Sequence, residues 1–188
     1  MIAVTKWRVT QPSEQDTLRI HLTPANFTIP GGRATLGFEV RPVNNSGLIP
    51  NTVEIDSLSP GNVPTIDEEI GLPGGSSLVL GKFKYGDFDV HITGLDGTTG
   101  SWELLIFLAG DVTGDFVVDT TDHDLLNDVV NGNNTDPDFL AEGDANRDGK
   151  ITGYDLARAS ENQGVATTVR ILTLTVGLDP RAIAFENV

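Results

Sequence analysis

The stretch FDVHITGLDGTTGSWELLIFL, from Phe88 to Leu108, gives the strongest indication of fold in this chain of 188 residues. Two runs of alternating apolar and polar residues flank a glycine-rich connection, and such alternation is typical of strands with one buried face. Asp96 and Gly97 supply the positive backbone φ that a tight connection between antiparallel strands needs. The stretch therefore predicts a β-hairpin within an antiparallel sheet.

The residues before this hairpin follow the same pattern. Short alternating runs, separated by glycine and proline, recur up to Ala109, and no helical periodicity interrupts them. About seven strands are expected, at 3–10, 17–24, 34–43, 52–58, 76–85, 88–95 and 101–110. Residues 1–109 are therefore predicted to form an antiparallel β-sandwich of the immunoglobulin-like or jelly-roll-like kind.

The composition changes after the hairpin. Residues 111–155 contain eleven Asp and one Glu against Arg147 and Lys150, so this segment holds a net charge of −10 out of −15 for the whole chain. Carboxylates at this density repel one another unless a cation neutralises them. The negative total also disfavours contact with phosphate backbones. We therefore expect cations, and not nucleic acid, as binding partners.

Two acidic loops of twelve residues, 33 residues apart, account for much of this charge. In each, oxygen-bearing groups recur at positions 1, 3, 5, 7, 9 and 12, the spacing by which a loop wraps about six to eight hard oxygen ligands around Ca²⁺. The first loop supplies Asp111, Thr113, Asp115, the carbonyl of Val117, Asp119 and Asp122. The second supplies Asp144, Asn146, Asp148, the carbonyl of Lys150, Thr152 and Asp155. Val118 and Ile151 hold position 8, through which paired loops commonly form a short β contact.

These loops resemble the duplicated calcium loop and helix of the dockerin family. The resemblance covers about 55 residues, with GDVTGD.VVD.TD..LL...V.G across Gly110–Gly132 and GDANRDGKITGYDL across Gly143–Leu156. It implies a calcium-folded module at 110–164 that docks onto a cohesin β-sandwich in secreted assemblies. In that family the two residues before the final ligand select the partner. Here those pairs are Thr120–Thr121 and Gly153–Tyr154, and their difference argues against a twofold-symmetric docking mode.

The two loops are not expected to bind calcium equally. Position 6 is Gly149 in the second loop but Phe116 in the first, where a side chain must take the left-handed conformation, at roughly 1 kcal/mol, or distort the loop. Thr113 also offers only a hydroxyl at position 3. Two Ca²⁺ sites are predicted, and the site between Asp144 and Asp155 is predicted to be the stronger.

β character returns after the module, in TVRILTLTVGLDP within residues 165–188. A strand there must pair with a sheet, and the module offers none. It therefore completes either this chain's sheet or that of a neighbouring copy. The predicted fold is mainly β, an antiparallel sandwich with a small helical, dockerin-like module inserted before the C-terminal strand or strands.

No catalytic motif is recognisable. The sequence has no cysteine nucleophile, no G-x-S-x-G elbow, no H-E-x-x-H helix and no phosphate-binding glycine loop. Its three histidines are His21, His91 and His123. Carboxylates on predicted strands are Glu54, Asp56, Asp87 and Asp89, for which a solvated sheet face is a simpler role than glycoside hydrolysis. We therefore expect no enzyme activity.

Two functional hypotheses follow, both for a secreted, calcium-binding structural protein. The first is a self-assembling filament or surface-layer subunit, in which residues 3–10 or 169–176 complete a neighbour's sheet by strand addition. The alternative is a dockerin-type module that docks a β-sandwich cargo to a cohesin-like partner. Carbohydrate binding is a weaker third, because Trp7 and Trp102 lie in strand patterns where a core position is the simpler reading.

An extracellular or cell-surface location is expected from the resemblance. Candidate glycosylation sequons, which fit a secreted glycoprotein, begin at Asn26, Asn44 and Asn133. No apolar run approaches the roughly 18 residues of a membrane span.

Overall fold

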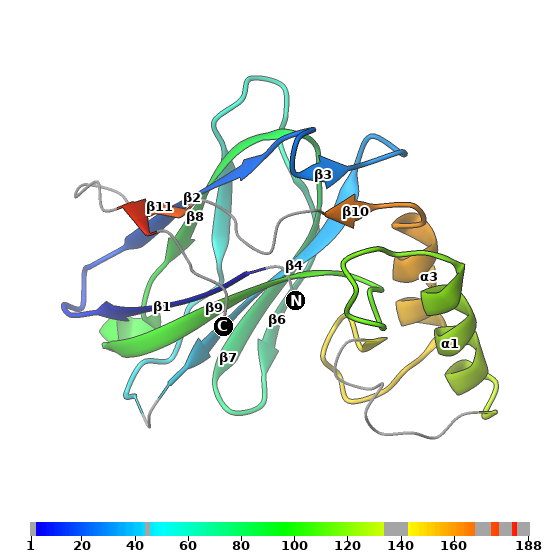
Figure 1. The fold of residues 1–188 in the computed structure, drawn as a ribbon. Coiled ribbons are helices and arrows are strands. Elements are labelled where there is room, and N and C mark those ends of the chain that lie inside the picture. Colours follow the sequence, from blue (N-terminus) through cyan, green and yellow to red (C-terminus); the bar gives the residue numbers. More distant parts are fainter. Residues whose placement is uncertain (1–2, 44–45, 134–142, 168–173, 177–181, 184–188) are drawn as a thin grey trace.

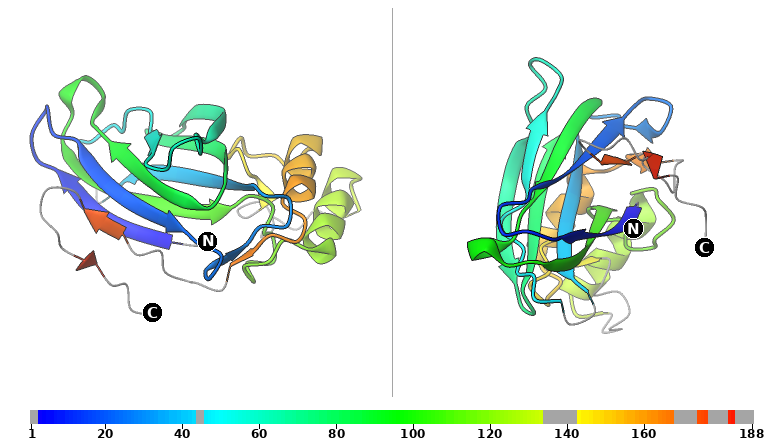
Figure 2. Two further views of the ribbon diagram at one scale, coloured as in Figure 1. Left: turned by 90° about the horizontal axis from the view of Figure 1, so that it is seen from above. Right: turned by 90° about the vertical axis from the view of Figure 1, so that its left-hand side faces the viewer.

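A computed structural model describes residues 3–43, 46–133, 143–167, 174–176 and 182–183. The chain is mainly antiparallel β-sheet, as the alternating sequence pattern predicts, and its two described α-helices lie together at one end (Figures 1 and 2). The described part contains no helix long and apolar enough to cross a membrane.

Two five-stranded sheets make up most of the molecule. The first has the order β1-β9-β4-β7-β6, formed by Ala3–Val9, Gly100–Leu108, Ala34–Pro42, Ser76–Phe83 and Thr65–Leu72. The second has the order β12-β11-β2-β8-β5, formed by Ala182–Ile183, Leu174–Val176, Asp16–Leu22, Gly86–Ile92 and Glu54–Ser57. A short pair joins β10, Ala166–Thr167, to β3, Phe27–Thr28. The helices are α1, Thr120–Val130, and α3, Gly153–Glu161.

The β8–β9 connection shows the expected backbone. It contains a short 3₁₀ turn, Leu95–Gly97, in which Asp96 has φ 52° and Gly97 has φ 75°. Strand β6 was not among the expected strands. It is an edge strand with β7 as its partner, and its register shifts between Ile66 and Glu68. An edge strand of half-exposed acidic residues has no buried face to impose alternation, which explains the omission.

The larger of two apolar clusters among the described residues lies between the two sheets, and a smaller one, of Leu78, Leu80 and Phe107, lies on β7 and β9 of the first sheet. The alternation in each strand places one face inward, with the buried residues Leu18, Ile20, Leu22, Leu36, Phe38, Val40, Phe88, Val90, Ile92, Leu104, Ile106 and Leu108. The Phe83 ring lies 5.1 Å from Phe38 in its own sheet and 5.3 Å from Phe88 in the other. These tilted and edge-to-face contacts link the two sheets. Each such buried side chain contributes about 1.5–3 kcal/mol to folding.

Trp102 belongs to this core, as expected. Its side chain is fully buried, and Nε1 donates a hydrogen bond to Asp16 Oδ2 at 2.8 Å. Burial raises the pKa of Asp16 to about 6, against the opposing effect of the indole hydrogen bond. A fully buried indole offers no stacking surface for a sugar. The side chain of Trp7 lies outside the described part of the structure.

The terminal strands both pair within this chain. β1 runs antiparallel to β9 along its length, and β11 pairs with β2 through Thr175 opposite Arg19. Residues 169–173 of the segment considered for strand addition lie outside the described residues. The described parts of both segments thus already hold positions in this chain's own sheets, and the reason for invoking donation to a neighbour is removed.

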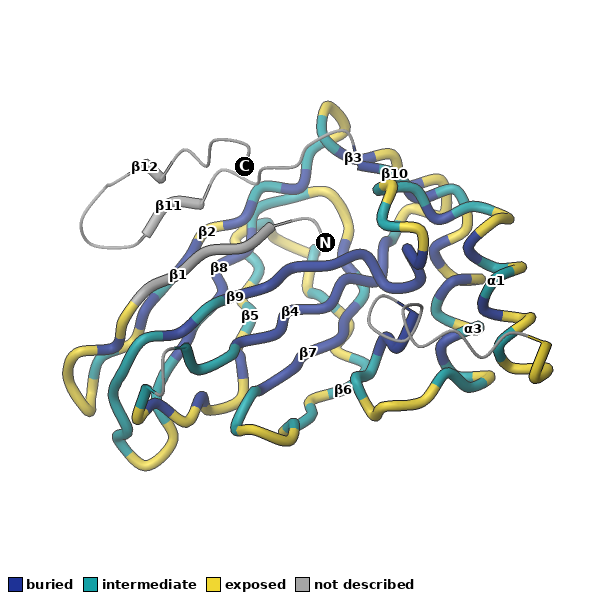
Figure 3. The backbone as a smooth tube through the Cα atoms, turned by 60° about the horizontal axis from the view of Figure 1, so that its bottom comes forward, coloured by how far each residue is buried: buried dark blue, intermediate teal, exposed yellow. Residues whose placement is uncertain are grey.

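The helical end shares the sandwich core. Val112, Val118, Leu126, Ala159 and Val165 are buried and pack in the same apolar cluster as the strands. Figure 3 shows the buried backbone of β9 continuing without a break into the helical end. The two parts are therefore packed together, and not tethered by an exposed linker.

Candidate metal centre

The first acidic loop, residues 111–122, begins where β9 ends and closes on the first turn of α1. Asp119 is the N-cap of this helix, since its Oδ1 accepts a hydrogen bond from Thr121 N at 2.6 Å. In return, Asp119 N donates to Asp122 Oδ2 at 2.9 Å, and Thr113 N donates to Asp122 Oδ1 at 3.0 Å. This capping box satisfies amides that a helix start leaves free. It also fixes positions 9 and 12 of the loop.

The second acidic loop, residues 144–155, closes on α3 in the same way. Thr152 is the N-cap, with Oγ1 accepting from Tyr154 N at 3.2 Å and its amide donating to Asp155 Oδ2 at 2.8 Å. Asp155 is fully buried, and its Oδ1 accepts from Ala145 N at 2.9 Å. The repeat in sequence is thus a repeat in structure, in which positions 9 and 12 are the N-cap and third residue of a helix.

A buried aspartate opens each loop. Asp111 is 1% exposed and Asp144 is 4% exposed. The Oδ2 of each accepts a hydrogen bond from the amide at position 6, at 3.2 Å from Phe116 and 2.7 Å from Gly149. Asp111 Oδ1 is buried and has no hydrogen-bond partner. A buried carboxylate oxygen without a donor is costly unless a cation meets it.

Burial raises the pKa of both opening carboxyls. The pKa of Asp111 rises to about 6, chiefly because burial disfavours the charged form, and the like charge of Asp122 adds to the effect. Burial likewise raises the pKa of Asp144, against the hydrogen bonds from the Gly149 and Asp148 amides, and Asp155 adds a like charge. Each loop therefore gathers two buried carboxylates whose repulsion a cation would relieve.

The two loops share a backbone conformation despite their different residues. Positions 4 and 6 have positive φ in both, with Gly114 at 69° and Phe116 at 72° in the first loop, and Arg147 at 58° and Gly149 at 85° in the second. Each loop therefore has one glycine and one strained residue, at exchanged positions. Phe116 adopts the left-handed conformation, and the loop is not distorted around it.

The other predicted ligands are more exposed. Asp115 Oδ1 accepts from Val117 N at 3.0 Å, and Asp148 Oδ1 accepts from Lys150 N at 2.9 Å, so position 5 turns the chain toward position 7 in both loops. Among the described residues, no three His, Cys, Asp or Glu side chains converge closely enough to hold an ion alone. Carbonyl, hydroxyl and amide oxygens would have to complete the shell. That mixture of hard oxygen donors fits Ca²⁺.

The expected contact between the loops at position 8 is wrong. Val118 N donates to Val165 O at 2.9 Å, and Gly164 N donates to Val118 O at 2.8 Å, so these groups are already paired. Thr167 N also donates to Phe116 O at 2.9 Å. The first loop is therefore braced by the segment that leads into β10. Ile151 packs against the shared core.

Two of the three histidines, His21 and His91, and three of the strand carboxylates form cross-strand pairs on β2, β8 and β5. His21 Nδ1 lies 2.7 Å from Asp87 Oδ1, and Arg19 forms two hydrogen bonds to Asp89, at 2.8 and 2.9 Å. His91 contacts Thr17 at 2.9 Å, and its Nε2 lies 3.3 Å from Asp56 Oδ2. His123 lies on α1, 3.8 Å from its neighbour Asp124. Glu54 stands opposite His91 in the register of β5 with β8. Cross-strand hydrogen bonds and ion pairs therefore account for the paired side chains on this sheet face.

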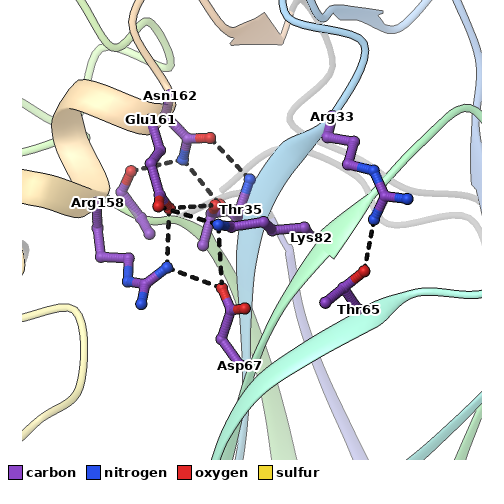
Figure 4. Close-up of polar contacts among 9 residues, drawn as sticks. Arg33, Thr35, Thr65, Asp67, Lys82, Arg158, Glu161 and Asn162 are labelled. Atoms are coloured by element: carbon purple, nitrogen blue, oxygen red, sulfur yellow. Dashed lines mark hydrogen bonds and ion pairs between the residues drawn. The ribbon is translucent and has the colours of Figure 1, made fainter.

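Sequence reasoning missed the residues that fasten α3 to the sandwich (Figure 4). Asn162, the C-cap of α3, donates from Nδ2 to Thr35 O at 2.8 Å and Ala109 O at 2.7 Å. Its Oδ1 accepts from Thr35 N at 2.7 Å. The buried amide thus bridges the start of β4 and the end of β9. An asparagine at a helix end is so common that it gives no signal for such a role.

A charged cluster lies beside this amide. Arg158 of α3 pairs with Asp67 of β6 and with Glu161, both at 2.8 Å. Lys82 of β7 pairs with Glu161 at 2.9 Å and lies 3.7 Å from Asp67. Two cations and two anions therefore alternate across the contact between α3 and the sandwich, as Figure 4 shows.

The second loop touches the same sheet through Arg147. Its guanidinium lies 4.3 Å from the centre of the Phe107 ring, and Nε lies 3.5 Å from Glu39 Oε2. Gly37 leaves space for that ring, since a Cβ on Gly37 would collide with Phe107. Position 4 of the second loop is thus also an anchor to β4 and β9.

Residues 109–160 match the family of dockerin type I domains. This part of the chain is a dockerin-type calcium-binding module. Dockerin domains are non-catalytic modules that bind Ca²⁺ and cohesins. No curated protein matches the chain, and no solved structure does.

Proposed function

We propose that this chain is an extracellular, non-catalytic docking protein, in which the dockerin-type module binds two Ca²⁺ ions and attaches the β-sandwich to a cohesin-like partner. The observation that carries the proposal is the pair of buried carboxylates in each loop, Asp111 with Asp122 and Asp144 with Asp155. Two like charges that share a buried site favour a divalent cation strongly. Ion binding is then coupled to folding of the module.

The proposed ligands are the residues that the loop spacing selects. In the first site they are Asp111, Thr113, Asp115, the Val117 carbonyl, Asp119 and Asp122. In the second they are Asp144, Asn146, Asp148, the Lys150 carbonyl, Thr152 and Asp155. Bound Ca²⁺ supplies positive charge and a fixed coordination geometry. The chain itself holds the carboxylates in position through the two capping boxes.

The second site is proposed to be the stronger. Asp144 accepts two amide hydrogen bonds, from Asp148 and Gly149, at 3.1 and 2.7 Å, and is therefore well oriented. In the first loop Asp111 has one such bond, from Phe116, at 3.2 Å. A better oriented carboxylate loses less conformational freedom when the ion binds.

The division of the chain follows from this role. The proposed parts are the sandwich at 1–109, the module at 110–164 and a C-terminal segment at 165–188 that completes this chain's own sheet. Pairing of β11 with β2 and of β10 with β3 supports the last assignment.

The test combines calcium titration with partner binding. Isothermal titration calorimetry on the full chain is expected to show two calcium sites, and immobilised recombinant cohesin modules are expected to retain the chain in calcium but not in EDTA. Asp144→Asn, with Asp155→Asn as a second variant, should remove one calcium and weaken retention. Retention that persists in EDTA, or no cohesin binding by a calcium-loaded chain, would overturn the proposal.

A further inference from the structure

One side chain of the second acidic loop reaches from the opening ligand to the sandwich. The guanidinium carbon of Arg147 lies 4.3 Å from the centre of the Phe107 ring, and Nε lies 3.5 Å from Glu39 Oε2. In the other direction, Nη1 donates to Asp144 O at 3.0 Å, and the Arg147 amide donates to the same oxygen at 3.3 Å. The side chain is 15% exposed. Arg147 therefore connects the residue that opens the loop to two side chains of β9 and β4.

The sandwich holds both of these side chains in fixed positions. Phe107 is buried and stands opposite Gly37 in the register of β4 with β9. A Cβ on Gly37 would lie 2.1 Å from Phe107 Cζ, so the ring rests directly on the β4 backbone. Glu39 is also buried, and its Oε2 accepts a hydrogen bond from Arg41 Nη2 at 2.8 Å. A ring and a carboxylate packed in this way have little freedom to move.

The groups that orient Asp144 lie next to Arg147 in the chain. The Asp144 carboxylate accepts hydrogen bonds from the amides of Asp148 and Gly149, at 3.1 and 2.7 Å. Arg147 precedes these two amides and holds a left-handed backbone, with φ 58°, which is unfavourable for a residue with a side chain. A displacement of Arg147 would therefore move both amides and disturb the orientation of the carboxylate.

We propose that Arg147 is a positioning residue for the calcium site at 144–155, and that Phe107 and Glu39 of the sandwich form the support of that site. The proposal rests on the proposed calcium-binding function. None of the three side chains is among the proposed ligands. They act by holding a ligand in place before the ion binds, and groups that orient metal ligands in this way strongly affect metal affinity. Calcium at this site in turn stabilises the contact between loop and sheet, because linkage is reciprocal.

The first loop cannot make the same contact. Its fourth position is Gly114, which has no side chain to reach a sheet. Backbone hydrogen bonds from the segment at 164–167 brace that loop instead. A change at Arg147 should therefore alter one calcium site and spare the other.

The charge of Arg147 has the opposite effect on calcium. A guanidinium beside a calcium loop repels the ion, so removing a guanidinium that has no positioning role would strengthen binding. Removing a positioning residue weakens binding. The sign of the change in affinity therefore separates the two roles.

Calorimetric calcium titration of full-length variants tests the proposal. In an Asp111→Asn background, where the second site is expected to remain, Arg147→Gln should lower the calcium affinity by about tenfold. Arg147→Lys keeps the charge but loses the planar group, and it should also lower the affinity. In an Asp155→Asn background, where the first site is expected to remain, Arg147→Gln should have no effect. An unchanged or higher affinity at the second site, or an equal loss at both sites, would overturn the proposal.

Two further variants separate positioning from a general loss of folding. Phe107→Leu changes no charge and no residue of the module, and it should weaken the second site without affecting the first. Arg33→Gln makes the same substitution at a guanidinium that bonds to Thr65 on the sandwich, and it should leave both sites unchanged. A Phe107→Leu chain that binds calcium as wild type does would contradict the role of the ring.

Hydrogen exchange in EDTA tests the positioning role without calcium. The amides of Phe116 and Gly149 hold equivalent positions in the two loops and donate to the opening aspartates. Arg147→Gln should speed exchange at Gly149 by about fivefold, equivalent to one lost hydrogen bond, and leave Phe116 unchanged. Unchanged exchange at Gly149 would overturn the proposal. A wild-type chain that binds no calcium would overturn the proposed function instead, and the exchange rates would still show whether Arg147 positions the loop.

Discussion

At the scale of single residues, two features set the properties of the module. One is that glycine stands at position 4 in the first loop and at position 6 in the second. The other is that some side chains bond to residues far away in the sequence. The sequence predicts that Phe116 must take a left-handed backbone or distort its loop, and it takes the left-handed form, with φ 72°. That conclusion was accessible because it depends on local geometry alone. The role of Asn162 was not, because its partner Thr35 lies 127 residues away and nothing near either residue indicates the contact.

Asp111→Asn should remove one of two calcium ions. The amide keeps the shape of the carboxyl but loses its charge, so the cost of burying that charge and its repulsion with Asp122 are both removed. Calorimetric titration should report one site, and the chain in EDTA should unfold at a higher temperature than wild type. Asp124→Asn, at an exposed carboxyl, serves as the control and should change neither quantity. Two full sites in Asp111→Asn would contradict the assignment.

Asn162→Ala should destabilise the whole chain. It removes three buried hydrogen bonds and leaves the amide of Thr35 and two carbonyls unsatisfied, at a cost of about 3 kcal/mol in the free energy of unfolding. Urea unfolding followed by tryptophan fluorescence measures the change. The exposed neighbour Gln163 gives a matched control, since Gln163→Ala should cost less than about 0.5 kcal/mol. Equal effects would show that the amide bridge is not stabilising.

At the scale of elements, each acidic loop is closed by the helix that follows it, and the first loop is also braced by β10. The helix starts were predictable, because a capping residue and an acidic third residue recur in both repeats. β6 and β10 were not. β6 has no buried face to give alternation, and β10 is two residues long and exists through its pairing with β3. Short or edge strands depend on tertiary contacts that a sequence window does not contain.

Thr167→Pro should weaken the first calcium site selectively. Proline removes the amide that donates to Phe116 O and so withdraws support from the strained position 6. Calorimetry should show a calcium affinity lowered by about fivefold at the first site, equivalent to one lost hydrogen bond, with the second site unchanged. Thr167→Ala keeps the amide and loses the hydroxyl bond to Asn26 O, so it should leave both affinities intact. An equal loss at both sites would point to general unfolding.

Acid should narrow the stability difference between calcium-loaded and calcium-free protein. Without calcium, the pKa of Asp111 is raised from 3.8 to about 6, so the folded chain takes up this proton before the unfolded chain does. The calcium-free protein should therefore gain stability as the pH falls through about 6, with no further gain below the ordinary pKa. In the same pH range protons compete with Ca²⁺ for the Asp111 carboxylate. The calcium-loaded protein therefore loses its greater stability over the calcium-free protein.

Melting temperatures in EDTA and in calcium, recorded from about pH 7.5 to about pH 5, measure this convergence. Asp111→Asn should reduce the rise in melting temperature that acid causes in EDTA. The part of that rise that is due to Asp16, whose pKa is also about 6, should remain. A difference between the two conditions that widens toward acid would contradict the sign of the effect.

At the scale of the whole molecule, the sandwich and the module share one apolar cluster. The alternating strands and the repeated loops are both visible in the sequence as separate patterns. Their common core is not, because it depends on which faces meet after each part has formed. Residues such as Val118 and Val165 look like ordinary apolar positions until the fold places them against the strands.

One cooperative unfolding transition is expected for the calcium-loaded chain. A shared core and the buried Asn162 bridge mean that neither part can unfold without exposing the other. Differential scanning calorimetry should show a single peak whose calorimetric and van't Hoff enthalpies agree. Two resolved peaks in calcium would show that the parts unfold independently.

The continuity of β9 with the first loop has a mechanical consequence. A pull applied to the first loop would pass through Asp111 and Gly110 directly into β9, which is bonded to β1 on one side and β4 on the other. Tension along that strand loads two ladders of hydrogen bonds in shear, so many bonds must yield together and not one after another. The load would therefore be carried by a strand that is bonded to a neighbour on both sides, which favours a sandwich that stays folded under traction.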